Sequence, residues 1–268
     1  MGAPRLAGIF VHPVKSTRRI EVETAELDEC GLVLDRRWML ADPEGRAVTQ
    51  RERPALARVR TRVAGDRIVV SAPDREDLVL PARPVPGGEV RVEVWDDRFS
   101  ARLVEGPGSA WFSEHLGTPC RLVWMSDDLV RPVDARHGRD GDRVAFTDGY
   151  PLLLIGRASL DDLNSRLDVP VPMDRFRPNL VVEGSEPFAE DGWARVRIGQ
   201  ATFRVAKSCA RCSVTTIDQA TGEKGPEPLR TLATYRKRNG KVLFGQYLLH
   251  DAPGWLRTGD PVDVLEIR

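Results

Sequence analysis

Two cysteines three residues apart, Cys209 and Cys212, lie in the run Lys207-Ser-Cys-Ala-Arg-Cys-Ser-Val-Thr-Thr-Ile-Asp218. Closely spaced thiols can bind a metal, form a redox disulfide or supply half of a zinc site. A four-thiolate zinc site needs a second pair at similar spacing, whereas Cys30 and Cys120 are isolated and no histidine is near the pair. The spacing therefore argues against structural zinc.

The residues that follow the pair bear on the remaining uses. A thioredoxin-like site needs its cysteines at the start of a helix, but Ser-Val-Thr-Thr-Ile is β-branched and predicts a strand over 213–218. Two interpretations stay open. One cysteine donates its thiolate to a metal that a cofactor carries, or both are ordinary core cysteines, since a free thiol packs as a small hydrophobe.

A second candidate site follows the first predicted strand, in the run Val11-His-Pro-Val-Lys-Ser16. Proline ends the strand and turns the chain, so Lys15 and Ser16 project beside backbone N–H groups that no strand pairing uses. A point charge, a hydroxyl and free amides together suit a phosphate group. The alternative is an exposed lysine beside a turn serine.

Arginine precedes a predicted strand in Leu34-Asp-Arg-Arg-Trp38. Side chains alternate along a strand, so only one of Arg36 and Arg37 can face a given site, and we place Arg36 on the face of Trp38. Its guanidinium fork can hold a phosphate while Asp35 orients it. A surface Asp–Arg pair is the alternative.

A similar arrangement occurs where the run Asp174-Arg-Phe-Arg-Pro-Asn-Leu enters an apolar strand. Arg177 and Asn179 are predicted on one face and Phe176 on the other. Guanidinium and amide together can bind a polar heterocycle. Alternatively, the arginine pairs with a carboxylate and the asparagine shapes a turn.

One carboxylate, Asp148, lies in a predicted turn just before the buried strand 152–155. From there it can reach a metal-bound water or a substrate proton. An aspartate before a glycine also forms Asx-turns, which is the simpler alternative.

Short strands dominate the elements that must position these residues. Helices are predicted over 109–116, capped by Ser109, from Ser159 onward with Asp162 in a capping box, and over 227–235. This pattern predicts a mainly β (α+β) fold of nearly closed antiparallel sheets. Strands are predicted at 6–11, 20–27, 38–41, 59–63, 68–71, 90–94, 99–104, 152–155, 180–182, 195–198, 201–206, 213–218, 244–250 and 262–265.

Composition narrows the class of protein. The 268 residues carry 40 basic and 40 acidic side chains, which gives no general attraction to nucleic acid or an anionic membrane. No signal peptide and no run of ~18 apolar residues is present, so we expect no membrane span and a cytoplasmic location. The polar segment 134–143 is the best candidate for a domain boundary or a mobile flap.

Eight short motifs, taken in order, resemble the MOSC family, and within it the amidoxime-reducing group and its bacterial relatives. The resemblance runs from about residue 6 to the C-terminus. The motifs are Pro-Val-Lys-Ser, Asp-Arg-Arg-Trp, Thr-Asp-Gly-Tyr-Pro-Leu, Leu-Asp-Asp-Leu-Asn, Phe-Arg-Pro-Asn, Cys-Ala-Arg-Cys, Glu-Pro-Leu-Arg-Thr-Leu-Ala-Thr-Tyr-Arg and Leu-Phe-Gly-Gln-Tyr.

This resemblance implies an N-terminal β-barrel module over 1–125 and a MOSC β-barrel domain with a few short helices over 126–268. It implies an oxidoreductase that binds the molybdenum cofactor (molybdenum with molybdopterin) and reduces N-hydroxylated compounds such as amidoximes, hydroxylamines and N-oxides. Family descriptions also use pyridoxal phosphate binding as a generic term. The alternative is a non-catalytic carrier of the cofactor, or a sulfur-handling protein in its metabolism.

The resemblance also assigns roles to residues of this chain. Cys212 corresponds to the thiolate that binds molybdenum, Cys209 is a neighbour that is not the ligand, and Asp148 is an acidic residue close to the metal. A soft thiolate suits such a sulfur-rich coordination sphere. The expected contacts to the phosphate, the pterin and the rest of the cofactor are Lys15, Ser16, Arg36, Arg177, Asn179, Ala210 and Arg211.

Two departures from the family bear on partners. Some bacterial relatives carry a C-terminal [2Fe–2S] domain, but this sequence has no spare cysteine cluster for one, and we expect no targeting segment like that of mitochondrial members. We therefore expect a separate electron-donor protein of the ferredoxin, flavodoxin or cytochrome type.

Overall fold

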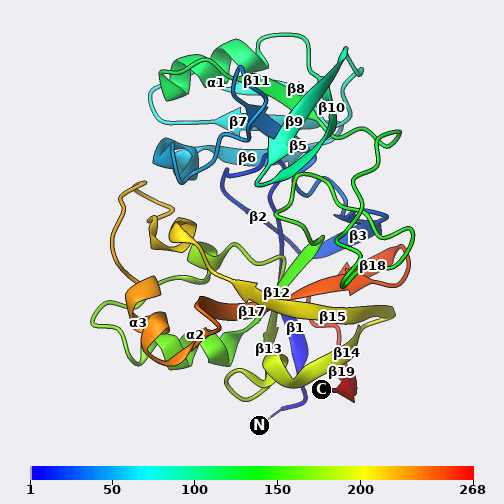
Figure 1. The fold of residues 1–268 in the computed structure, drawn as a ribbon, viewed down its shortest axis with the longest axis vertical. Coiled ribbons are helices and arrows are strands. Elements are labelled where there is room, and N and C mark those ends of the chain that lie inside the picture. The colour runs from blue at the N-terminus through cyan, green and yellow to red at the C-terminus, as the bar shows by residue number, and fades with distance from the viewer. Residues whose placement is uncertain (1) are drawn as a thin grey trace.

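The computed structural model describes residues 2–268, which form mostly strands together with three short α-helices (Figure 1). The expected mainly β, α+β class is confirmed. The largest sheet has the order β19 (Val262–Ile267), β14 (Trp193–Ile198), β15 (Ala201–Ala210), β17 (Lys241–His250), β12 (Leu152–Gly156), β13 (Leu180–Glu183), β1 (Arg5–Val11) and β2 (Ile20–Val22), with β16 (Lys237–Arg238) on β17.

Two smaller sheets form what we call the upper half of the molecule, and the large sheet with its helices forms the lower half (Figure 1). The upper half contains β5 (Trp38–Ala41), β11 (Arg121–Trp124), β10 (Asp97–Leu103) and β9 (Glu89–Val94), then β6 (Arg60–Ala64), β7 (Arg67–Ser71) and β8 (Leu78–Pro81), with α1 (Gly108–Leu116) and the 3-10 helix η1 (Pro54–Arg58). The lower half adds α2 (Arg157–Asn164), α3 (Leu229–Tyr235), η2 (Met173–Phe176), η3 (Ala189–Gly192) and η4 (Ser213–Thr216).

The first strands of the chain belong to the lower half. β1 pairs with β13, and a separate sheet joins β3 (Thr24–Asp28) and β4 (Gly31–Leu32) to β18 (Gly254–Arg257) near the C-terminus. The chain therefore starts in the lower half, builds the upper half and returns after β11. The division at residue 125 stays a prediction about domains, and the segment before β5 joins both halves.

Burial explains why β12 is apolar at every position. Leu152 and Leu154 pack into the core that β1, β14 and β15 share, whereas Leu153 and Ile155 pack on the opposite face with α2 and α3. Successive side chains of a strand point to opposite faces, so a strand covered on both sides needs no polar position. Burial of each such side chain contributes about 2 kcal/mol.

Most predicted strands are confirmed, but two segments differ. Residues 20–27 form two strands with different partners, because β2 pairs with β1 and β3 pairs with β4 and β18. The predicted strand 213–218 is wrong, since η4 begins at Ser213. There the Thr215 hydroxyl donates to the carbonyl of Cys212 at 3.0 Å, and such local bonds compete with strand pairing.

The helices are confirmed, but their predicted caps are wrong. Ser109 lies inside α1 and accepts a hydrogen bond from the Leu122 N–H at 2.9 Å. Ser159 lies inside α2 and donates to the buried carboxylate of Glu190 at 2.8 Å. Glu190 also accepts from the Gly156 N–H at 3.0 Å, so a side chain from η3 satisfies the start of α2.

Within residues 2–268, helices are too short or too polar to cross a bilayer.

Candidate functional site

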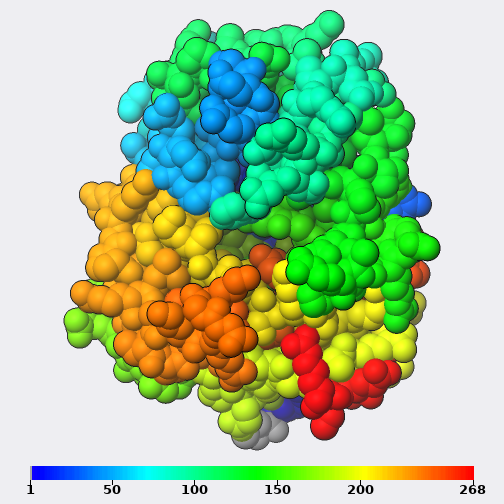
Figure 2. Space-filling view, in the orientation of Figure 1, coloured from blue at the N-terminus to red at the C-terminus, as the bar shows by residue number. Residues whose placement is uncertain are grey.

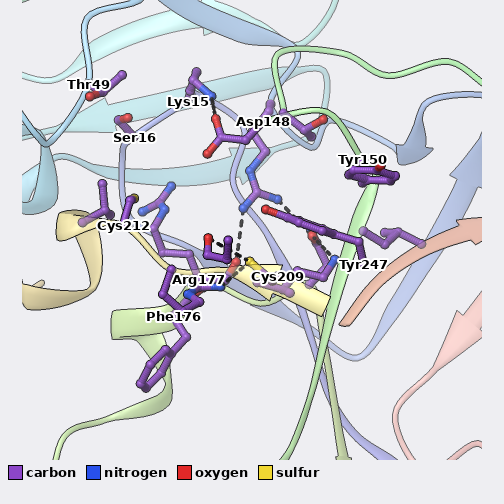
Figure 3. A pocket seen from close by; sticks show the side chains of 18 of the residues that line it. Lys15, Ser16, Thr49, Asp148, Tyr150, Phe176, Arg177, Cys209, Cys212 and Tyr247 are labelled. Atoms are coloured by element: carbon purple, nitrogen blue, oxygen red, sulfur yellow. Dashed lines mark hydrogen bonds and ion pairs between the residues drawn. The ribbon is translucent and has the colours of Figure 1, made fainter. Parts of the chain in front are cut away.

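A pocket opens where the two halves meet, and the expected site residues converge on it (Figure 3). They come from the turn after β1, the segment before β5, the segment before β12, the segment between η2 and β13, and the end of β15 with the residues that follow it. The lining includes Lys15, Ser16, Arg36, Thr49, Arg51, Asp148, Tyr150, Phe176, Arg177, Asn179, Cys209, Ala210, Arg211, Cys212, Val214 and Tyr247.

The charge of this pocket differs sharply from that of the whole chain. One carboxylate, Asp148, lines it, against the cations Lys15, Arg36, Arg51, Arg177 and Arg211. Because the chain as a whole is neutral, this excess is local. Clustered guanidinium forks with an ammonium form a site for an anion that carries several oxygens, such as a phosphate.

Cys212 reaches the pocket because of how β15 ends. The pairing of β15 with β17 shifts between Ser208 and Ala210, where β17 has one extra residue and Gly245 takes a φ of 81°. A bulge of this kind bends the chain and redirects its side chains. Cys212 then precedes η4 in an extended conformation and is partly exposed, whereas Cys209 is buried.

Cys209 has a different part in the site. Arg211 donates from Nη1 to the Cys209 Sγ at 2.9 Å and from Nη2 to the carbonyl oxygen of Phe176 at 2.7 Å. The buried thiol therefore helps fix Arg211 against the pocket wall. Since no three His, Cys, Asp or Glu side chains of residues 2–268 gather to hold an ion, a metal at Cys212 needs further ligands from a cofactor.

Lys15 and Asp148 form a close ion pair. The Lys15 Nζ donates to Asp148 Oδ1 at 2.5 Å and to the carbonyl oxygen of Phe146 at 2.9 Å. Burial lowers the pKa of Lys15, and the Asp148 carboxylate opposes that effect. The expected phosphate contact of Lys15 is therefore limited to its third N–H.

The same pair fixes the protonation of Asp148. Desolvation acts to raise the pKa of Asp148, but the charge and hydrogen bond of Lys15, together with the charges of Arg51 and Arg36, hold that pKa well below its usual range. Asp148 is consequently a carboxylate at neutral pH. It is suited to accept a hydrogen bond, whereas the depressed pKa makes it a weak proton acceptor and leaves it no proton to donate at neutral pH.

Arg36 is oriented as expected, by Asp35, but from a different backbone conformation. Its Nη1 donates to Asp35 Oδ2 at 2.6 Å and to Asn179 Oδ1 at 3.0 Å. The predicted shared face with Trp38 is wrong: Arg36 has a φ of 47°, outside any strand, and Trp38 is fully buried in the core of the upper half. Arg37 points away from the pocket and pairs with Asp28.

Asn179 holds parts of the site together through hydrogen bonds to Arg36 and to two neighbouring strands. Its Oδ1 accepts from Arg36 and from the Leu153 N–H at 3.2 Å, and its Nδ2 donates to the carbonyl oxygen of Phe10 at 3.1 Å. These bonds leave a single amide N–H for a ligand, and the expected contact of this amide with a heterocycle stays a prediction. Asn179 ties β1, β12 and Arg36 together.

Arg177 is a pocket arginine whose pKa is lowered by its surroundings. It has a φ of 55°, and its Nη1 donates to the carbonyl oxygen of Thr17 at 2.6 Å. Burial and the nearby Arg36 cation lower its pKa to about 9. Two guanidinium groups held close together in a partly dry pocket are stabilised when an anion binds between them.

Sequence reasoning missed part of the lining. Arg51 and Thr49 occur in a polar stretch without periodicity, so no local pattern assigns them to a pocket. Tyr247 is part of a motif that carries the family resemblance, and its ring stacks on Tyr150 with centroids 4.8 Å apart. That motif was the available signal for an aromatic wall.

Two family models match this chain. Residues 3–119 match the MOSC N-terminal beta barrel domain, and residues 141–263 match the MOSC domain. The chain therefore belongs to the MOSC family.

The relatives of this chain include amidoxime-reducing components and molybdenum cofactor sulfurases. The chain is 35% identical over 279 residues to mitochondrial amidoxime-reducing component 1 of Mus musculus, and 35% identical over 278 residues to that of Homo sapiens; each alignment covers 97% of this chain and 82% of the relative. It is 34% identical over 288 residues to a molybdenum cofactor sulfurase of Oryza sativa subsp. japonica, covering 96% of this chain but 35% of that longer protein.

The residues present fit a molybdenum cofactor. One partly exposed thiol, a group of buried and half-buried cations and an aromatic wall share one pocket. Cys212 offers the soft donor, while Arg36 and Arg177 offer the positive charge that a phosphate-bearing group requires. The roles expected for Ser16, Ala210 and Arg211 stay predictions, although all three residues line the pocket.

Proposed function

We propose that this MOSC protein binds the molybdenum cofactor in the pocket between its halves and reduces N-hydroxylated compounds with electrons from a separate protein. The observation that carries the proposal is the single partly exposed thiol of Cys212 in a wall whose other charged groups are mostly cations. When bound, the cofactor supplies two-electron molybdenum chemistry able to break a nitrogen–oxygen bond.

The chain's own residues hold and orient the reacting groups. Cys212 supplies the thiolate for the metal, and Arg36 and Arg177 bind the anionic end of the cofactor. Asp148, held ionised by Lys15, accepts a hydrogen bond from the substrate's N–OH and orients it. The protons consumed in the reduction come from water, because a carboxylate with so low a pKa does not carry them.

The relatives support this proposal and also a second one. Two of them are named for amidoxime reduction, whereas the rice relative is a cofactor sulfurase, of which this chain matches about a third. Under the second proposal the protein carries the cofactor or handles its sulfur and has no turnover of its own. A carrier releases cofactor to an apo-enzyme, and an oxidoreductase retains it through many cycles.

The test measures benzamidoxime reduction by cofactor-loaded protein with reduced methyl viologen as the electron donor. We expect turnover by the natural protein and by Cys209→Ser, since a serine hydroxyl still accepts a bond from Arg211. Cys212→Ser should lose more than about a hundredfold in kcat, while pterin retention, measured by fluorescence after release, stays largely intact.

Equal rates for the two cysteine variants contradict the role given to Cys212. Absence of any turnover by molybdenum-containing protein contradicts the oxidoreductase proposal and leaves the carrier proposal standing. A cytoplasmic location remains part of the proposal and is checked by cell fractionation.

A further inference from the structure

A group of arginines, of which only Arg18 meets a carboxylate among the described residues, lies beside the pocket around η1, on β6 and in the turn before β2. We propose that this group docks an acidic electron-donor protein, an inference that rests on the proposed function. We call it the arginine surface and define it as Arg18, Arg53, Arg58, Arg60 and Arg62. Arg53, Arg58, Arg60 and Arg62 are exposed, and Arg18 is half-buried.

Charge is concentrated here in an otherwise balanced chain. Residues 51–62 contain five arginines and one acid, Glu52. Elsewhere most arginines meet a carboxylate, as Arg204 does with Asp142 at 2.7 Å. Among the residues that the structure describes, the closest carboxylate to any member of the arginine surface is Asp174, at 4.0 Å from Arg18. Apart from Arg18, these cations have no carboxylate partner within the part of the chain that the structure describes, and they are left for an external partner.

The arginine surface surrounds a hollow that fits an acidic side chain. Arg18, Arg58 and Arg60 line it together with Ser71, and no carboxylate contributes to its wall. Arg60 and Ser71 are direct partners across the β6–β7 ladder, so their positions are fixed by the sheet. Guanidinium groups converging on one hollow can bind a carboxylate through paired N–H donors.

This surface is continuous with the rim of the cofactor pocket. Arg51, in the same segment, lines the pocket, and the Lys224 Nζ donates to its carbonyl oxygen at 2.6 Å. Ala220, which lines the hollow, follows Gln219, whose side chain bonds to that of Gln50 at 3.0 Å. A protein bound to the arginine surface thus lies against the pocket rim, as electron transfer requires.

An aromatic residue beside Arg51 completes the interface. Trp95 forms the tip of the β9–β10 hairpin, is 49% exposed and has a φ of 58°, which is strained for a bulky side chain. The Arg51 guanidinium lies 4.0 Å from the centroid of its ring. Figure 2 shows the segment near residue 50 and this hairpin side by side above the hollowed centre of the molecule.

Trp and Arg are the residues most enriched at energetic centres of protein interfaces. The arginine surface surrounds a single hollow and adjoins an aromatic anchor. A polynucleotide instead needs a track of cations along its backbone, and a membrane needs a broad basic face. The arrangement therefore favours an acidic protein.

The test measures the affinity of cofactor-loaded protein for a reduced acidic flavodoxin by interferometry at several salt concentrations. Arg58→Glu with Arg60→Glu should weaken binding by about tenfold or more and flatten its salt dependence. Arg53→Glu with Arg62→Glu, at fully surface positions, is a second variant that should act in the same direction. The matched control, Arg157→Glu with Arg257→Glu, makes the same change in net charge on α2 and β18 and should bind within about twofold of the natural protein.

Amidoxime reduction with methyl viologen should be equal in all these proteins, because none of the exchanged residues lines the pocket. Equal flavodoxin affinity in both surface variants and the control overturns the inference. So does binding to anionic vesicles or single-stranded RNA in place of flavodoxin. Since binding and viologen turnover are separate readouts, failure of docking leaves the proposed function intact, and loss of turnover leaves the binding result readable.

Discussion

At the scale of single residues, the site works through contrasts between chemically similar groups. Cys212 is presented to the pocket, whereas Cys209 is buried and bonded to Arg211. Arg36 lines the pocket, whereas Arg37 points away from it and pairs with Asp28. The sequence predicted that only one arginine can serve the site, from the alternation of a strand, but the actual cause is a left-handed turn at Arg36.

Lys15→Met should raise the pKa of Asp148. In the natural protein Lys15 holds that pKa below its usual range, so Asp148 is ionised at neutral pH and stabilises the fold until acid protonates it. Without the ammonium, only the charges of Arg51 and Arg36 still oppose desolvation, so the pKa of Asp148 rises from its depressed value. NMR titration of the side-chain carboxyl carbon measures the shift directly. An unchanged pKa in Lys15→Met contradicts the pairing.

Anion binding should weaken in alkaline solution because of Arg177. Its pKa of about 9 lies below the usual arginine value, since burial and Arg36 disfavour its charge. Charged Arg177 therefore costs stability below that pH, and a bound anion offsets the cost. The affinity for pyrophosphate, measured by calorimetry, should fall between about pH 8 and pH 10.

Arg177→Gln is the control for this pH dependence. It should bind pyrophosphate more weakly at neutral pH and show a flatter profile across the alkaline range. A natural protein whose affinity stays constant above pH 9, or a variant with the same slope, contradicts the assignment.

At the scale of elements, the bulge in β17 decides where the cysteine pair points. Gly245 has a φ of 81°, and a Cβ there would lie 2.7 Å from Ile155 Cγ1 and 2.9 Å from the carbonyl oxygen of Leu154. A side chain at this position must displace β12 or straighten the bulge. Either change moves the end of β15 on which Cys212 depends.

Gly245→Ala should lower the free energy of unfolding by about 2 kcal/mol or more, because strain and a clash with backbone add. Gly254→Ala is the matched control in β18, since nothing lies within 4 Å of a Cβ there and its φ is not positive, so its change should stay within about 0.5 kcal/mol. Chemical denaturation of both variants gives the comparison. Equal stabilities contradict the role assigned to the bulge.

Sequence patterns predicted the strands well where they are continuously apolar, as in β12. A strand that is buried on both faces consists of consecutive apolar residues, and this run is visible in the sequence. The strand predicted at 213–218 is a 3-10 helix instead. Threonine hydroxyls there bond to backbone carbonyls, and these local bonds stabilise the helix despite the high β propensity of the residues. Sequence patterns also missed β18, whose pairing with β3 joins residues far apart in the chain. Non-local pairing of this kind leaves no local signal.

At the scale of the whole molecule, the pocket exists because two halves built from interleaved parts of the chain are held in contact. The sequence motifs identified Cys212, Lys15 and Arg177 as members of one site through family resemblance. Local chemistry alone left each of them open. Neither the motifs nor local chemistry identified Arg51 as a pocket residue or predicted the Gln50–Gln219 contact. Both depend on how the upper half meets η4.

The Gln50–Gln219 pair should couple the two halves energetically. Both side chains are buried and exchange two hydrogen bonds, of 3.1 and 3.0 Å. Gln219→Ala leaves the Gln50 amide partly unpaired and should cost about 1–3 kcal/mol of stability. A double-mutant cycle with Gln50→Ala should show less than additive loss, by about 1 kcal/mol. Strict additivity contradicts the coupling.

The bond between Cys212 and molybdenum is the central claim, and X-ray absorption at the molybdenum edge tests it most directly. Protein produced in a host that makes the cofactor should contain roughly one molybdenum per chain, and Cys212→Ser should show one sulfur neighbour fewer at the metal than the natural protein. Cys209→Ser should match the natural protein. A natural protein without molybdenum, or the same sulfur count in Cys212→Ser, would contradict the account.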